Sequence, residues 1–199
     1  MKGILTTEEK ERKDKRNKVI LGTILVFLML MSTAGYAFFS GDQEINTSGE
    51  ILEYKGVEFV KDQISNYWDY EINGYQFRTA YNPEEVSGIK NDMILTLADY
   101  QDKPFYYYFD NESEGQEAIG EIYNNLNYFI LRAQGVCLKG TECNNELPIK
   151  SCSEDKIIII KYEEELGVKQ EEGCVTITGP QGEILKSSDS YIYKMMGLI

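Results

Sequence analysis

The sequence predicts an α+β fold in which one exported domain follows an N-terminal single transmembrane helix. An uncharged run at residues 19–39 predicts the transmembrane helix, since about 20 apolar helical residues cross the core of a bilayer. Short strand patterns joined by turn residues predict a mostly antiparallel sheet. Apolar residues at helical spacing after residue 115 predict one long amphipathic helix, and a short helix is expected at the C-terminus.

The charges around the apolar run give the chain an orientation. Residues 1–18 hold seven Lys or Arg and four Asp or Glu, whereas residues 40–50 hold no Lys or Arg. Because basic residues stay on the cytoplasmic side, we expect 1–18 to be a cytoplasmic basic tail and 19–39 a signal-anchor helix in the cell membrane. Residues 40–50 would form a polar stalk, and residues 51–199 an extracytoplasmic acidic α+β domain.

A cleaved signal peptide is the alternative interpretation of the same run. Gly35, Tyr36 and Ala37 form a small-x-small pattern, so cleavage could occur near Ala37. The long basic segment and the continuation of the apolar run to Phe39 favour an uncleaved anchor. Both interpretations export the same domain, and the sequence leaves the choice between them open.

The exported part is strongly acidic. The whole chain has a formal net charge of −13, and residues 1–18 contribute +3 while residues 19–40 contribute none, so residues 41–199 carry −16. Such a surface repels the phosphates of DNA, of RNA and of anionic lipid head groups. We therefore expect no nucleic-acid partner.

All four cysteines, Cys137, Cys143, Cys152 and Cys174, lie in the exported part. An even number in an oxidising compartment favours two disulfides, and three pairings exist. We favour Cys137–Cys143 with Cys152–Cys174, because the first pair closes a short loop rich in glycine and polar residues. The spacing fits neither the paired knuckles of a zinc site nor the C-x-x-C motif of redox enzymes.

Turn residues mark two hairpins in the first third of the domain. Asn73-Gly74 is the stronger signal, because this pair tolerates the positive φ angles of a type I′ turn, and Lys55-Gly56 is a second such turn. The expected strands are 51–54, 57–60, 67–72, 75–80, 93–97, 105–109, 157–160, 168–170 and 174–178.

The long amphipathic helix is expected to begin at a capping box, Ser113–Gln116, and to end near Gly135. One face of this helix would carry the apolar residues that recur every three or four positions. These are Ile119, Ile122, Leu126, Phe129, Ile130 and Ala133.

Two shorter helices are also expected. Asn82 as a cap and Pro83 as the first residue predict a helix of about one turn. Asp189 is expected to cap the C-terminal helix at 190–196, and Gly197 is expected to end it.

The sequence contains no histidine, which removes the commonest general base and metal ligand. No Walker, dinucleotide or G-x-S-x-G motif occurs either, so we predict no catalytic residue, no cofactor and no metal site. The segment from Asp110 through Glu112 and Glu114 to Glu121 has the spacing of a calcium loop. Glutamates replace the shorter side chains that such a loop needs, and we interpret the segment as an acidic helix start.

Two sets of residues are candidates for surface contacts. Tyr67, Trp68 and Tyr70 cluster, and the alternation of side chains along a strand favours core packing for them. The alternative is an exposed face that stacks on sugars or contacts a protein. Asn46 and Asn111 begin Asn-x-Ser/Thr triplets, which become glycosylated only if the host modifies exported chains.

Together these patterns favour a membrane-anchored envelope protein whose exported domain binds or scaffolds a protein or glycan partner without catalysis. The alternative is an exported enzyme. One form is a glycan hydrolase, which needs only two close carboxylates in a cleft. The other is an atypical thiol–disulfide protein that uses the four cysteines.

Overall fold

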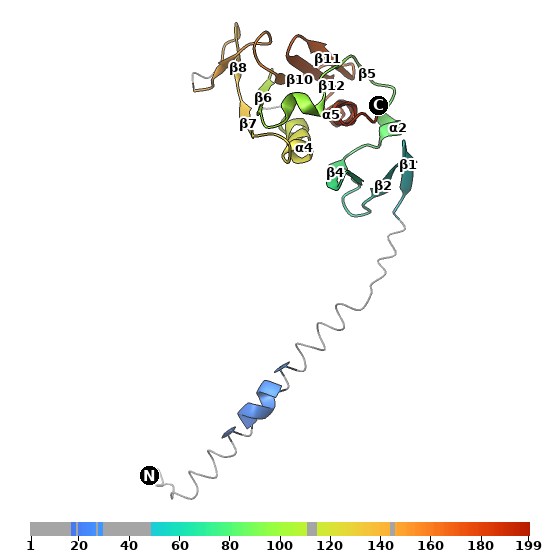
Figure 1. Cartoon of the computed structure of the whole chain (residues 1–199), viewed down its shortest axis with the longest axis vertical. Coiled ribbons are helices and arrows are strands. Elements are labelled where there is room, and N and C mark those ends of the chain that lie inside the picture. The colour runs from blue at the N-terminus through green and yellow to red at the C-terminus, as the bar shows by residue number, and fades with distance from the viewer. Residues whose placement is uncertain (1–16, 19, 27, 30–48, 111–114, 144–145) are drawn as a thin grey trace, which may run out of the picture. The chain divides into compact units, whose positions relative to one another are not determined.

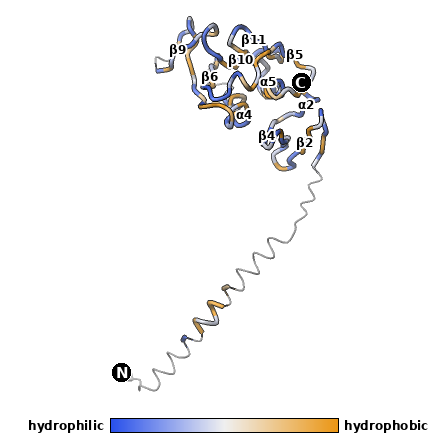
Figure 2. The backbone as a smooth tube through the Cα atoms, in the orientation of Figure 1, coloured by the Kyte–Doolittle hydropathy of each residue, from blue (hydrophilic) through white to orange (hydrophobic). Residues whose placement is uncertain are grey.

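The chain divides into two compact units, Met1–Thr47 and Ser48–Ile199. The computed structural model describes residues 17–18, 20–26, 28–29, 49–110, 115–143 and 146–199 (Figure 1). In the first unit the described residues are helical and largely apolar (Figure 2). Within the described ranges no helix is both long and apolar enough to span a membrane. More than half of the expected anchor at 19–39, including Ala37, and most of the stalk at 40–50 lie outside those ranges.

The second unit has the predicted α+β class, with antiparallel strand pairing and a C-terminal helix. Its first sheet is antiparallel throughout, and the four strands lie in chain order, β1-β2-β3-β4. Their bounds are β1 Ile51–Tyr54, β2 Val57–Lys61, β3 Trp68–Ile72 and β4 Tyr75–Thr79.

Both tight turns of this sheet have the backbone that their residues favour. Lys55 and Gly56, between β1 and β2, have φ angles of 49° and 79°. Asn73 and Gly74, between β3 and β4, have φ angles of 52° and 83°. Two successive positive φ angles are typical of a type I′ turn, whose twist matches that of hairpin strands. Both predicted hairpins are confirmed.

The second sheet has six strands in the order β5-β11-β12-β10-β6-β7, and all neighbours are parallel except β11 and β12. The expectation of a mostly antiparallel sheet therefore holds for the first sheet and not for this one. Parallel neighbours need a long crossover, and helix α4 supplies it between β6 and β7. The bounds are β5 Lys90–Asn91, β6 Pro104–Phe109, β7 Arg132–Gly135, β10 Ile157–Tyr162, β11 Gly167–Glu171 and β12 Cys174–Gly179; a separate parallel pair is β8 Cys137–Leu138 and β9 Ile149–Lys150.

Helices α4 (Gln116–Leu126) and α5 (Ile184–Met195) pack against each other, and their apolar residues form the core of the six-stranded sheet (Figure 1). A second core joins the four-stranded sheet to the end of α5, where Tyr193 and Leu198 pack on the aromatic side chains of the strands. Helix α5 therefore contributes to both cores and connects the two sheets.

Local signals at two helix ends act as the sequence predicts. The side chain of Asn82 accepts hydrogen bonds from backbone N–H groups in the first turn of α2. The Glu85 carboxylate accepts the Asn82 N–H at 2.8 Å, which completes a capping box. After α5, Gly197 has a φ of 73° and the Leu198 N–H donates to the Tyr193 carbonyl at 2.9 Å, which ends the helix in a Schellman motif. The two short helices are α2 Pro83–Val86 and α3 Leu97–Tyr100.

The long helix ends earlier than its apolar spacing predicts. Helix α4 stops at Leu126, and Arg132–Gly135 forms strand β7 instead of a further helical turn. Residues 132–135 form a strand because they pair with β6, and this long-range pairing outweighs the helical spacing of the local sequence. The expected start of the helix at Ser113 lies outside the described residues.

Two other expected elements differ from the structure. The expected strand at 93–97 is irregular, and α3 begins at its last residue, Leu97. The C-terminal helix starts at Ile184, so Asp189 lies in its middle and is completely buried instead of capping it. The serines around Asp189 suggest a loop in the sequence, but their small side chains let the helix pack closely in the core.

The type I′ turn between β3 and β4 provides a stability test. Replacing Gly74 (φ 83°) by alanine places a Cβ in the left-handed region and should lower the free energy of unfolding by about 1–2 kcal/mol. Gly88→Ala is the matched control, because Gly88 has no positive φ and its added Cβ meets nothing within 4 Å. Urea unfolding of the full chain measures both variants, and equal stabilities would contradict the turn assignment.

Candidate binding site

Two adjoining cavities of about 660 and 600 Å³ lie between helix α4 and strand β7, and we call them together the α4–β7 groove. Both are lined by Tyr107, Phe109 and Gln116. The first continues toward the Cys137–Cys143 loop, where Glu142, Cys143 and Leu147 line it, and the second continues toward Tyr123, Leu131 and Arg132.

The aromatic floor of the groove follows from the alternation of strand β6. Tyr107 and Phe109 are two positions apart, so they share the sheet face that α4 covers, and their ring centroids are 5.4 Å apart. Two glycines keep the space beside these rings open. A Cβ on Gly120 of α4 would meet nothing within 4 Å, and one on Gly135 of β7 would lie 3.5 Å from the Tyr107 ring.

The first cavity of the groove lies at the carboxyl ends of the parallel strands β6 and β7. Strand β6 connects through α4 to β7 on one side, while β10, later in the chain, pairs with its other side. The strand order therefore reverses between β6 and β10, whereas the groove lies on the β7 side of β6 and no β10 residue lines it. Asp110 directly follows β6 and Gln116 begins α4, so both lie at the carboxyl end of β6.

Polar side chains are placed at both ends of the groove. Asp110, Gln116 and Glu142 line the first cavity and supply two carboxylates and an amide. Arg132 lines the second cavity and supplies a guanidinium. A ligand in the groove would meet aromatic rings along the floor and hydrogen-bonding groups on the walls.

The aromatic residues singled out in the sequence do not form a surface. Trp68 and Tyr70 are 2% and 3% exposed and pack in the core beneath the four-stranded sheet, while Tyr67 is half-buried. Trp68 and Tyr70 are two positions apart on β3, so both face the end of α5. Trp68 and Tyr70 therefore pack in the core, as the alternation of the strand favours, and are not available for the possible binding face at Tyr67, Trp68 and Tyr70.

The cysteines form the favoured pairing, Cys137–Cys143 and Cys152–Cys174. The first disulfide closes the loop beside the groove, and Cys143 contributes to the groove wall. The second ties the start of β12 to the loop between β9 and β10, and Cys174 is only 2% exposed.

The two glycosylation candidates, Asn46 and Asn111, lie outside the described residues. The calcium-like segment also runs through 111–114, which lie outside them too. In the part of the chain that the structure describes, no three potential ligand residues come close enough to hold a metal ion. Glu121, the last position of that pattern, faces the core at 7% exposed.

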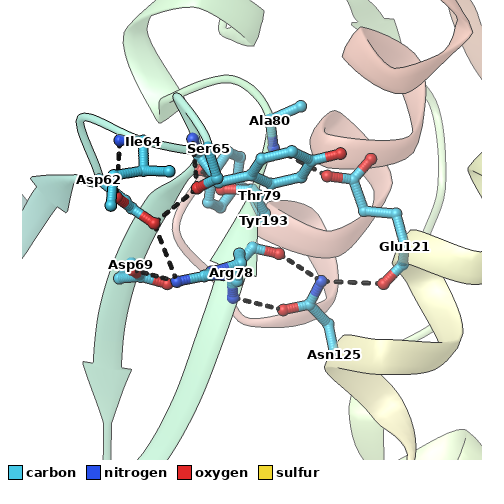
Figure 3. A network of polar contacts seen from close by, with 11 residues as sticks. Asp62, Ile64, Ser65, Asp69, Arg78, Thr79, Ala80, Glu121, Asn125 and Tyr193 are labelled. Atoms are coloured by element: carbon cyan, nitrogen blue, oxygen red, sulfur yellow. Dashed lines mark hydrogen bonds and ion pairs between the residues drawn. The ribbon is translucent and has the colours of Figure 1, made fainter.

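Glu121 belongs instead to a buried carboxyl pair with Asp189 (Figure 3 shows Glu121 beside the end of β4). Glu121 Oε1 accepts the Ala80 N–H at 2.8 Å, and Asp189 Oδ2 accepts the Tyr81 N–H at 2.8 Å. The two carboxyl groups act on each other, and each changes the pKa of the other. Burial raises the pKa of Glu121 to about 7 and the pKa of Asp189 well above its ordinary value. Neither residue lines the groove, so the pair is closed to a substrate there.

Comparison with known protein families, with curated proteins and with solved structures finds no match to this chain. Function is therefore inferred from the geometry of the groove and of the carboxyl pair.

The sequence contains one signal that could have located the groove. Gly120 interrupts an otherwise good helical pattern, and a glycine inside a helix costs about 1 kcal/mol relative to alanine. Such a residue is typical of a close approach or an open space beside the helix. The floor residues carry no comparable signal, because Tyr107 and Phe109 resemble any buried strand.

The two disulfides should contribute unequally to stability. Cys152–Cys174 spans 22 residues and Cys137–Cys143 only 6, so the entropy model gives about 3 and about 2 kcal/mol respectively. Paired serine variants of the full chain, compared by urea unfolding, should show the larger loss for Cys152–Cys174. A larger loss for Cys137–Cys143 would contradict the expected order.

Proposed function

We propose that the chain is a membrane-anchored, extracytoplasmic binding module whose α4–β7 groove binds a neutral glycan without catalysis. The observation that carries this proposal is the groove itself, with its aromatic floor and its polar walls. Aromatic ring faces suit the C–H faces of sugar rings, while carboxylate and amide groups accept and donate hydrogen bonds to hydroxyls. A neutral ligand fits best, because residues 41–199 carry −16 and two carboxylates line the groove.

Two features support an exported and anchored location. Both pairs of cysteines form disulfides, which persist in oxidising compartments. In the first unit, Ile20, Leu21, Leu25 and Leu28 are each 49% to 64% exposed, so this helix presents apolar side chains that need an apolar environment. The proposed anchor is the run at 19–39, with the basic tail on the cytoplasmic side.

One observation favours a second candidate, a thiol–disulfide protein. Cys143 contributes to the groove wall, so a bound partner would lie beside the Cys137–Cys143 disulfide. This candidate predicts that mild reductant opens that disulfide in the native full chain faster than Cys152–Cys174. Mass spectrometry after alkylation of the released thiols distinguishes the two bonds, and equal resistance would remove the candidate.

The groove can be blocked without harming the fold. Gly120→Leu should lower the affinity for a bound glycan at least tenfold, because the new side chain occupies the open space beside Tyr107 and Phe109. The same variant should unfold at equal or higher urea concentration, since leucine has a better helix propensity than glycine by about 0.5–1 kcal/mol. Calorimetric titration of the full chain in lipid nanodiscs with chitohexaose and cellohexaose measures the affinity without a sugar-based detergent.

Asn124→Leu is the matched control, because Asn124 is an exposed residue of the same helix that does not line the groove. It should leave the affinity unchanged. Failure of the wild-type chain to bind either oligosaccharide, or equal affinity in Gly120→Leu, would contradict the proposal. Binding of extended peptides alone would replace a glycan by a protein partner.

A further inference from the structure

We propose that Glu121 and Asp189 form a proton-binding site that fastens the four-stranded sheet to helices α4 and α5. One proton shared by the two carboxyl groups would keep the sheet docked, and its loss would loosen the docking. This inference concerns the interior of the domain and is independent of any ligand in the groove.

The geometry ties each carboxyl to a different helix and to the same stretch of backbone. Glu121 comes from α4 and is 7% exposed, whereas Asp189 comes from α5 and is 0% exposed. They accept the N–H groups of consecutive residues, Ala80 and Tyr81, both at 2.8 Å. The pair therefore joins three elements at the point where the chain leaves β4.

The remaining oxygen of each carboxyl needs a proton. Glu121 Oε2 and Asp189 Oδ1 are both buried, and neither has a donor from any other described residue. Two ionised carboxylates would repel each other and leave both oxygens unsatisfied. One proton between them converts the repulsion into a hydrogen bond that satisfies both, and a second proton would be left without an acceptor.

The rest of this junction is held by groups that do not change charge near neutral pH (Figure 3). Asn125 accepts the Arg78 N–H at 2.8 Å and donates to the Arg78 carbonyl at 2.7 Å. The Tyr193 hydroxyl donates to the Tyr81 carbonyl at 2.7 Å and hydrogen-bonds the Thr79 hydroxyl. Only the carboxyl pair can therefore make the junction sensitive to pH in this range.

The surroundings offer almost no positive charge to stabilise a second negative one. Arg78 is the cation of the adjoining strand β4, but its guanidinium pairs with Asp69 at 2.6 Å and with Asp62 at 3.6 Å. The other titratable groups that act on the pair are acids and phenols. They are Glu117 on α4, Tyr67 before β3, Tyr70 on β3 and Tyr193 on α5, and Glu85 on α2 acts in turn on Tyr193.

The direction of the pH effect follows from the raised pKa values. Both carboxyls have a higher pKa in the folded chain than in the unfolded one, where about 4 is ordinary. Their stabilisation is then fully present below pH 4. It decreases as the pH rises through about 7, the pKa of Glu121, and decreases further as Asp189 ionises. The carboxyl pair is thus expected to contribute more to the free energy of unfolding in mildly acidic solution than at pH 8.

The test compares urea unfolding of the full chain between pH 6 and pH 8. Ionisation of one group with a pKa of about 7 lowers the folded-to-unfolded ratio about tenfold over this range, and ionisation of Asp189 adds to it. The ratio of the wild type should therefore fall at least tenfold. Glu121→Gln and Asp189→Asn each place an amide N–H where the shared proton lies and keep an oxygen for the backbone. Both variants should lose most of this fall.

Two further variants separate a proton site from ordinary packing. The double variant Glu121→Gln with Asp189→Asn turns two amide donors toward each other and should be less stable than either single variant. Asn125→Ala removes an uncharged contact of the same junction, so it should lower stability equally at pH 6 and pH 8.

A variant-free measurement keeps the test decisive if an amide variant fails to fold. The infrared spectrum of the wild-type chain at pH 6 should show a carboxylic acid band that disappears toward pH 8. Absence of that band at pH 6, a wild-type stability that is flat from pH 6 to pH 8, or an unchanged slope in Glu121→Gln would overturn the proposal.

Discussion

The backbone at the end of strand β4 is held by side chains instead of by another strand. β4 is the edge of its sheet, so its outer N–H and C=O groups have no strand partner. Asn125 pairs with both backbone groups of Arg78, and the Glu121–Asp189 pair accepts the N–H groups of Ala80 and Tyr81. Buried backbone groups must be satisfied, and these helices can cover the edge only because they carry polar residues on their inner faces. The two sheets form one unit through this arrangement.

The same constraint explains the unusual composition of helix α5. Its middle, from Ser187 to Ser190, is polar in sequence yet completely buried. Ser187 accepts the Gly167 N–H at 3.1 Å, and the Ser190 carbonyl and hydroxyl accept from the Asn91 amide. The helix is thus attached by short polar contacts to β11 and β5 and, through Asp189, to the four-stranded sheet. A fully apolar helix could pack there but would leave these groups without partners.

Turns and helix ends that depend on residues close in the sequence could be predicted. Strands and buried contacts that depend on residues far apart in the sequence could not. Asn73-Gly74, the Asn82 cap and the Gly197 stop act within a few residues, and each occurs as expected. Strand β7 exists because β6 lies beside it, which no local pattern shows. Asp189 looks like a helix cap because buried carboxyls are rare, and its partner Glu121 lies 68 positions away. The groove escapes prediction for the same reason, since its floor and walls come from β6, α4 and β7.

Helix α4 connects the carboxyl pair to the groove through its own geometry. Glu121 and Asn125, four residues apart, face the junction with β4, while Gln116, Gly120 and Tyr123 line the groove. A shift of α4 that separates the carboxyls would therefore also move one wall of the groove. Suppose that a ligand binds more tightly when α4 is in its docked position. Protonation of the carboxyl pair would then raise the affinity for the ligand, and by linkage the bound ligand would raise the affinity of the pair for its proton by the same factor. Ligand binding and proton binding would then be properties of a single helix position.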